Sequence, residues 1–163
     1  MSDSYAPSSY DHFYCLKPPL MMWLAVLYLS RALTLPIAMA VGSFSGVNDA
    51  AIHAFRSLWS ADKLAPSALA AVVLIAAFRR APQAAGLVRW IWAHGRILLA
   101  AAAALDLGLS LIAPLRAGEI DERTIVGVIA AAIDAYFLVY ILASRRMRDT
   151  FAEFPPPLEA TKE

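Results

Sequence analysis

Four long apolar stretches run through this chain, and they constrain its fold more than any other feature of the sequence. They occupy about residues 19–41, 64–78, 97–115 and 125–144. A helix of about 20 residues, at about 1.5 Å per residue, covers a hydrocarbon core of about 30 Å. The pattern therefore predicts an all-α, polytopic membrane protein, a bundle of four transmembrane helices joined by short loops.

The composition favours lipid as the solvent of this chain. Hydrophobic residues make up 60% of its 163 residues and charged residues 17%, against roughly 45–50% and 25% in soluble domains. A net charge of +1 gives no electrostatic basis for binding nucleic acid. The single cysteine, Cys15, excludes an intramolecular disulfide and a zinc cluster.

Some of the segments between and within the spans allow more than one interpretation. Residues 64–78 are short for a full crossing, so a re-entrant or buried helix is the alternative to a second span. Pro36 is expected to kink the first span. Residues 50–59 could form a short amphipathic helix on the membrane surface. Residues 79–96 contain four arginines and no acid, which indicates an interfacial segment at the headgroups, with Trp90 and Trp92 as belt residues at the lipid interface.

The distribution of basic residues predicts the orientation of the chain. If the tails 1–18 and 145–163 and the segment 79–96 are cytoplasmic, nine Lys and Arg residues lie inside, and four lie in outside segments: Arg56, Lys63, Arg116 and Arg123. Positive charges concentrate on the cytoplasmic side of membrane proteins. We therefore expect both tails in the cytoplasm. If residues 64–78 did not cross, the two ends would lie on opposite sides.

Three charged side chains fall near the middle of predicted spans. One such residue at a helix centre costs about 2.5–3.5 kcal/mol on insertion scales. Because opposite charges at similar depth offset each other, we expect Arg31 to pair with Asp106, Asp134 or both inside the bundle. The expected intramembrane charge network also includes three hydroxyl-bearing neighbours at helical spacing: Tyr28, Thr34 and Ser110.

This network has a structural and a functional interpretation. As a structural element it would fix which helices pack together. As a functional element it would mark a transport or proton pathway, since two carboxyls against one guanidinium leave one aspartate that could hold a proton. A docking point for a partner subunit is a third interpretation.

A second group of basic residues flanks the spans and predicts a basic cytoplasmic face. Its simplest role is to set the topology. Its sharper role would be to bind anionic lipid or an acidic partner. The group consists of Arg79, Arg80, Arg89, Arg96, Arg145, Arg146 and Arg148.

No motif in the sequence indicates catalysis, a metal or a cofactor. His94 has no second His or Cys at metal spacing, so a surface histidine is the simpler interpretation. There is no nucleophile elbow, no phosphate-binding glycine loop and no H-E-x-x-H sequence. We therefore expect no catalytic residue, no metal and no cofactor.

Several short motifs resemble a family of small bacterial inner-membrane proteins known as domain of unknown function 2919. The resembling residues are Tyr10-Asp11, Leu16-Lys17-Pro18-Pro19, Trp23, Leu29-Ser30-Arg31 and Phe154-Pro155. Cys15 stands where the family suggests a glycine. The resemblance implies a location in the bacterial inner membrane and no particular activity.

Two classes of function follow from these expectations. The first is an accessory, assembly or scaffold component of a membrane complex, with the bilayer, anionic lipid, a membrane protein or a second copy of the chain as partner. The second is an oligomeric proton-coupled transporter or channel that uses the Arg and Asp site at the midplane. A membrane enzyme comes third, because no substrate site is evident.

Overall fold

The structure is a computed structural model that describes residues 5–44, 61–116 and 122–156. Over these ranges the chain is helical and contains no β-strand, which confirms the all-α prediction. The α-helices are α1 (Leu20–Leu29), α2 (Arg31–Phe44), α4 (Leu64–Phe78), α5 (Gly86–Arg116), α6 (Glu122–Ala143) and α7 (Arg145–Ala152); two short 3-10 turns are η1 (Pro7–Ser9) and η2 (Ala61–Lys63). Residues 50–59, expected as a surface helix, lie outside the described part.

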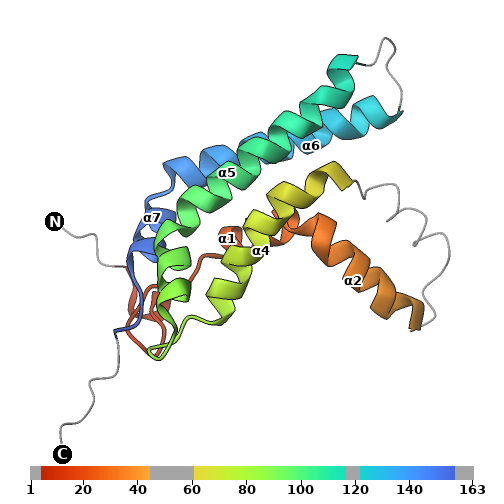
Figure 1. The fold of residues 1–163 in the computed structure, drawn as a ribbon. Coiled ribbons are helices and arrows are strands. Elements are labelled where there is room, and N and C mark those ends of the chain that lie inside the picture. Colours follow the sequence, from red (N-terminus) through yellow and green to blue (C-terminus); the bar gives the residue numbers. More distant parts are fainter. Residues whose placement is uncertain (1–4, 45–60, 117–121, 157–163) are drawn as a thin grey trace, which may run out of the picture.

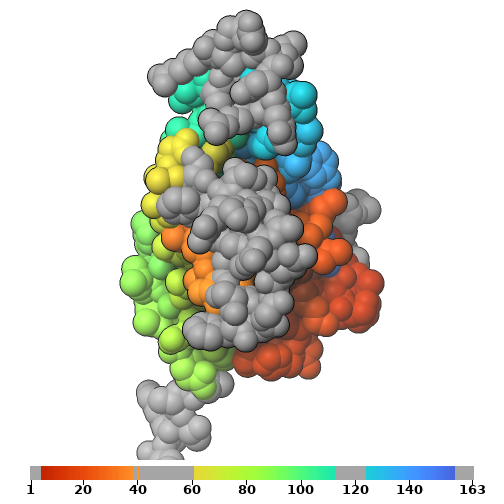
Figure 2. All heavy atoms as spheres, turned by 90° about the vertical axis from the view of Figure 1, so that its right-hand side faces the viewer, coloured from red at the N-terminus to blue at the C-terminus, as the bar shows by residue number. Residues whose placement is uncertain are grey.

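The long helices α5 and α6 form an antiparallel hairpin against which the rest of the chain packs (Figure 1). Helix α4 lies along α5, α1 packs on α4, and α7 turns back onto the start of α5. In Figure 2, the orange and red atoms of the first 44 residues lie beside α4 and α5 on one side and the blue atoms of α6 on the other. The N-terminal segment and α7 meet at one end of the bundle (Figure 1).

Three described helices are long and apolar enough to cross a membrane: Ala61–Phe78, Gly86–Ile112 and Thr124–Ala143. Helices α1 and α2 meet the same test together but are bent by 78°, so the number is four if this pair is one broken span. Large apolar side chains face outward along these helices, among them Ile75, Leu105 and Ile129. An outward apolar surface of this extent is what a lipid solvent requires.

The first span is broken at Ser30, whereas Pro36 was the expected position of a kink. Pro36 lies inside α2, which continues past it. Just after Ser30, the Ala32 N–H donates to the Ser67 hydroxyl on α4 at 3.3 Å. The Ser67 hydroxyl in turn donates to the Leu29 carbonyl at 2.7 Å. A side chain from a neighbouring helix inserted into the ladder explains the bend.

Residues 79–96 are not a structural element of their own. A short turn follows Phe78, and from Gly86 onward the chain belongs to α5, whose 31 residues extend over about 46 Å. This length exceeds a hydrocarbon core of about 30 Å, so one end of α5 projects beyond it. Beyond α6 the chain continues as α7, whose first turn is capped by the Ser144 hydroxyl accepting from the Met147 N–H at 3.3 Å.

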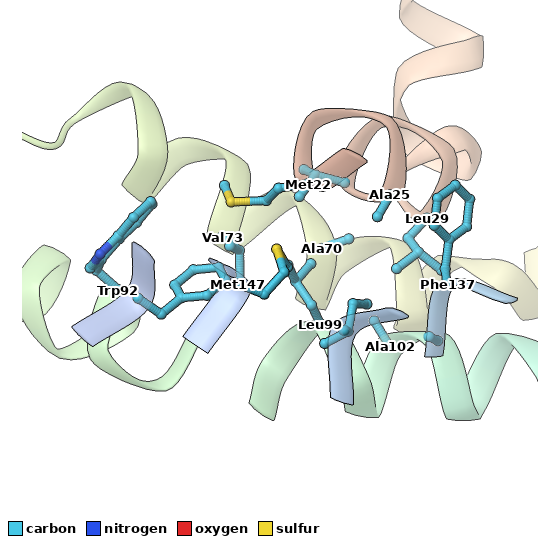
Figure 3. Close-up of a cluster of buried hydrophobic side chains, with 14 residues drawn as sticks. Met22, Ala25, Leu29, Ala70, Val73, Trp92, Leu99, Ala102, Phe137 and Met147 are labelled. Atoms are coloured by element: carbon cyan, nitrogen blue, oxygen red, sulfur yellow. The ribbon is translucent and has the colours of Figure 1, made fainter. Parts of the chain in front are cut away.

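The buried core connects α1, α4, α5, α6 and α7. Met22, Ala25 and Leu29 of α1 meet Ala70 and Val73 of α4 at its centre. Figure 3 shows how side chains from α5, α6 and α7 complete the cluster: Trp92, Leu99, Ala102, Phe137 and Met147. Small residues at the centre allow close approach of the backbones, as helix packing in lipid requires.

Gly95 of α5 packs against Phe151 of α7, and substituting it tests the docking of α7. A Cβ at this position would collide with the Phe151 ring. We expect Gly95→Ala to destabilise the protein by about 1–3 kcal/mol through overpacking. Gly108→Ala, on the same helix with open space around it, is the matched control and should leave the thermal midpoint unchanged or raised. Thermal unfolding in detergent measures both, and equal midpoints for the two variants would contradict the α5–α7 contact.

Candidate functional site

Asp106 lies at the centre of a buried charge cluster between α2, α5 and the start of α4. Asp106 is 1% exposed. The Arg31 guanidinium contacts Asp106 Oδ2 with an Nη1–Oδ2 distance of 2.6 Å, and the Lys63 ammonium contacts Oδ1. Lys63 also donates to the Asp106 backbone carbonyl at 3.0 Å. The carboxyl is therefore held by two cations, one on each oxygen.

Asp134 joins the cluster through a hydroxyl and contacts neither cation directly. The Ser110 Oγ donates to Asp134 Oδ2 at 3.0 Å and accepts from Lys63 Nζ at 2.6 Å. The other carboxyl oxygen, Oδ1, makes no hydrogen bond within the described structure, and Asp134 is fully buried. The Tyr28 hydroxyl lies one turn away, where it donates to the Ala130 carbonyl at 3.4 Å.

Arg31 also links α2 to α1 across the bend at Ser30. Its Nη1 donates to the Tyr28 carbonyl at 3.1 Å, and its guanidinium lies over the Tyr28 ring at 4.2 Å from the centroid. Arg31 thus contacts both sides of the bend and the carboxyl that neutralises it. Because a guanidinium presents several donors in a plane, one side chain can make all these contacts.

The expected network is present in part and contains one residue that the sequence did not indicate. Arg31, Asp106, Asp134, Ser110 and Tyr28 come together, whereas the Thr34 hydroxyl donates to the Ser30 carbonyl of its own helix at 3.2 Å. Lys63 was assigned to an outside loop. Lys63 lies in η2, directly before α4, and its spacing of four from Ser67 would place both polar residues on one face if the helix began at Lys63; that was the available signal.

The Ser67 hydroxyl satisfies two backbone groups at the bend, so its removal should cost more than that of a hydroxyl within one helix. Ser67 is 1% exposed. We expect Ser67→Ala to cost about 1–3 kcal/mol, because it removes the buried hydroxyl that bonds both the Leu29 carbonyl and the Ala32 N–H. Thr34→Val is the matched control, since its bond is an internal one that adds little. Equal thermal midpoints for the two variants would show that Ser67 does not hold the bend.

The predicted basic face separates into inward and outward arginines. Arg80 donates to the Leu16 carbonyl at 3.1 Å and to the Glu153 carbonyl at 3.2 Å, and its guanidinium lies 4.8 Å from the centroid of the Trp92 ring. The Leu16 N–H donates to Glu153 Oε2 at 2.5 Å. We call Leu16, Arg80, Trp92 and Glu153 the terminal clasp, because they join the N-terminal segment to the residues after α7.

Trp92 is fully buried in the terminal clasp. Its indole N–H is directed at the Glu153 carbonyl at 2.9 Å and the Thr150 carbonyl at 3.2 Å, and its ring lies 4.8 Å from that of Phe151. A buried indole is stable only where its N–H has a partner. Trp92 is therefore a structural residue of this clasp and not a belt residue at the lipid interface.

Two further arginines bind backbone carbonyls of the C-terminal part of the chain. Arg89 donates to the Pro155 carbonyl at 3.1 Å and lies over the Phe154 ring at 4.6 Å. Arg96 donates to the carbonyls of Ile141, at 3.0 Å, and Leu142, in the last turn of α6. A cation at this position also complements the helix dipole.

The other four arginines of the predicted basic face lie at the surface of the protein. Arg79, Arg145 and Arg148 are exposed and Arg146 is half-buried. Arg148 forms an ion pair with its neighbour Asp149 at 3.6 Å. The face able to meet headgroups or a partner is therefore smaller than the sequence indicated.

Cys15 lies in the N-terminal segment, next to Leu16 of the terminal clasp. Asp11 holds this turn, since its Oδ1 accepts from the N–H groups of Phe13 and Cys15 at 2.9 and 3.0 Å. The thiol is 6% exposed, and burial raises its pKa. A raised pKa and poor access both make the thiol unreactive while the clasp is closed.

No group of described residues suits a metal ion. Over residues 5–44, 61–116 and 122–156 there is no group of three His, Cys, Asp or Glu side chains that could hold a metal. His94 contacts the Trp90 carbonyl one turn back at 2.9 Å and its ring lies 4.5 Å from that of Trp90.

Comparison with known proteins yields one match. The family model described as "Protein of unknown function (DUF2919)" matches residues 5–153, a range that includes the charge cluster and the terminal clasp. No curated protein and no solved structure is similar enough to the chain to count as a match.

Proposed function

We propose, from the premise that this chain belongs to the family of unknown function DUF2919, that it is an accessory, assembly or scaffold component of a membrane complex. Its place would be the bacterial inner membrane, with the end that carries the terminal clasp in the cytoplasm. The exposed arginines at that end, Arg79, Arg145 and Arg148, support this orientation through the bias of positive charge toward the cytoplasm.

The observation that carries this proposal is that the membrane-embedded cations are already paired within the chain. Arg31 and Lys63 both contact Asp106, and Ser110 links this group to Asp134. With two acids and two bases, the group can be neutral without a ligand. A buried ion group of this kind specifies which helices pack together, and the outward surface left for a partner is apolar.

The partner would bind through apolar helix faces. Large exposed side chains follow α5 and α6, for example Leu105 at 49%, Ile129 at 55% and Val139 at 64% exposure. The same surface fits lipid, a second copy of this chain or a helix of another membrane protein, since all three are apolar. Anionic lipid would bind beside it, at the exposed arginines.

Chemical crosslinking in intact membranes, followed by gentle solubilisation, tests the proposal. We expect a crosslinked species larger than one chain. Substituting Trp for Leu105, Ile129 or Val139, one at a time, should abolish the crosslink at one of these positions at unchanged abundance. Wild type that runs as a single chain with no crosslinked species, or a crosslink that survives all three substitutions, would count against a partner on this surface.

A second candidate is proton-coupled transport or conduction by an oligomer. It is favoured by the bend at Ser30 beside buried charges, because broken helices that carry ion sites are typical of transporters. Proton flux into proteoliposomes that is present in the wild type and absent in Asp134→Asn, at equal protein incorporation, would support it. Equal flux in protein-free vesicles and in wild-type vesicles would exclude it.

A further inference from the structure

A directed chain of hydrogen bonds leads from Lys63 to Asp134. Lys63 Nζ donates to Ser110 Oγ at 2.6 Å, and Ser110 Oγ donates to Asp134 Oδ2 at 3.0 Å. Both hydrogen bonds run in the direction from Lys63 to Asp134. A proton can therefore pass along the chain without either donor changing its acceptor. Lys63 lies in η2 at the end of the candidate span Ala61–Phe78, and its side chain keeps 14% exposure.

Asp134 has an incomplete set of hydrogen bonds for an ionised carboxyl. It is fully buried, contacts no cation, and its Oδ1 makes no hydrogen bond within the described structure. A buried carboxylate normally has all its lone-pair sites occupied, because desolvation of the charge is costly. Adding a proton removes that charge, so the environment of Asp134 favours proton uptake.

The other groups that face Asp134 cannot take up a proton in its place. Arg31, from α2, is permanently charged. Asp106, from α5, is held by cations on both oxygens. The Tyr28 hydroxyl, from α1, already carries its proton and donates it to the Ala130 carbonyl. Lys63, from η2, already carries its proton and donates the first hydrogen bond of the chain that leads to Asp134.

We propose that Lys63, Ser110 and Asp134 form a proton-binding site whose acceptor is the Asp134 carboxyl. A proton leaves Lys63 Nζ for Ser110 Oγ as the Ser110 hydroxyl proton moves to Asp134 Oδ2. Lys63 then regains a proton from water, to which its side chain keeps 14% exposure. The net reaction converts the Asp134 carboxylate and one aqueous proton into a carboxylic acid, and the charge of Arg31, Lys63, Asp106 and Asp134 together rises from zero to +1.

The accessory role does not need this proton-binding site. In the second candidate function, proton-coupled transport, Asp134 would be the group that takes up the proton. Proton binding does not require transport, because a protein that only senses acidification could use the same site. Proton binding and proton flux are therefore measured separately, and the absence of flux alone does not bear on the site.

Infrared difference spectroscopy of the full-length protein in lipid nanodiscs tests the acceptor. On acidification the wild type should develop a carboxylic acid C=O band that exchanges slowly with deuterated water, as expected of a fully buried group. Asp134→Asn should lose this band and Asp149→Asn, at an exposed pair on α7, should keep it. A wild type without a slowly exchanging band, or a band that survives in a folded Asp134→Asn variant, would overturn the proposal.

Two variants at Ser110 test the relay while Asp134 stays in place. Ser110→Ala removes the bridging hydroxyl and should slow deuterium exchange of the Asp134 band by about tenfold or more. Ser110→Thr keeps a hydroxyl and should exchange at nearly the wild-type rate. If Asp134→Asn fails to fold, the comparison of the two Ser110 variants still tests the proton-binding site. Equal exchange rates in the Ala and Thr variants would exclude Ser110 as the link.

Discussion

Asp106→Ala is expected to be the most damaging single substitution in the membrane-embedded part of the protein. It removes the carboxyl that contacts both Arg31 and Lys63 and leaves two cations beside apolar helices. Breaking a buried ion pair by removing one partner typically costs about 3–5 kcal/mol. Since a protein's whole stability is on the order of 5–15 kcal/mol, the variant should accumulate at a small fraction of the wild-type level.

The abundance of Asp106→Ala in isolated membranes and its thermal midpoint in detergent measure this effect. Asp149→Ala, which removes a carboxyl outside the bundle, is the control and should remain near the wild-type level. Replacing Arg31, Lys63 and Asp106 together by Leu or Met should recover part of the loss, because apolar residues often substitute for a buried ion group. If Asp106→Ala showed wild-type abundance and a wild-type thermal midpoint, the charge cluster would not be what organises the helix packing.

Trp92→Ala should have the next largest effect, and it acts at the other end of the bundle. Truncating a fully buried tryptophan costs about 3–5 kcal/mol. It also removes the ring over which Arg80 lies and the donor that binds the Glu153 and Thr150 carbonyls. We expect α7 and the N-terminal segment to separate before the transmembrane helices do.

Cys15 provides a direct measurement of this separation, because it is the single cysteine of the chain and is buried beside Leu16. Its alkylation by a maleimide should be slow in the wild type and much faster in Trp92→Ala. Trp90→Ala is the matched control, since Trp90 is 56% exposed two residues away and should leave the rate unchanged. The same alkylation rate in both tryptophan variants would contradict a closed terminal clasp.

The parts of the fold that follow from hydropathy could be predicted from the sequence. Stretches of about 20 apolar residues have few solutions in lipid other than a helix, and this gave the all-helical class. The contact of Arg31 with Asp106 followed from a similar principle, since opposite charges at similar depth in different spans stabilise each other. These arguments need no knowledge of how the helices are arranged.

Contacts between a side chain and the backbone of another segment could not be predicted in the same way. The bend at Ser30 depends on the Ser67 hydroxyl from α4, and a local motif such as Pro36 says nothing of it. Arg80 and Arg89 appeared to be headgroup-facing charges because their partners are carbonyls near the C-terminus. A carbonyl carries no signal in the sequence, so these partners emerge only once α7 is in place.

The terminal clasp has a consequence for the order in which the protein matures during synthesis. Leu16 and Glu153 are 137 residues apart, so their contact cannot form until residue 153 has left the ribosome. Until then Arg80 and Trp92 lack the Glu153 carbonyl that both bind in the finished protein. A nascent chain that stalls before residue 153 would display this unsatisfied surface beside the membrane, where a quality-control protease could distinguish it from a completed molecule.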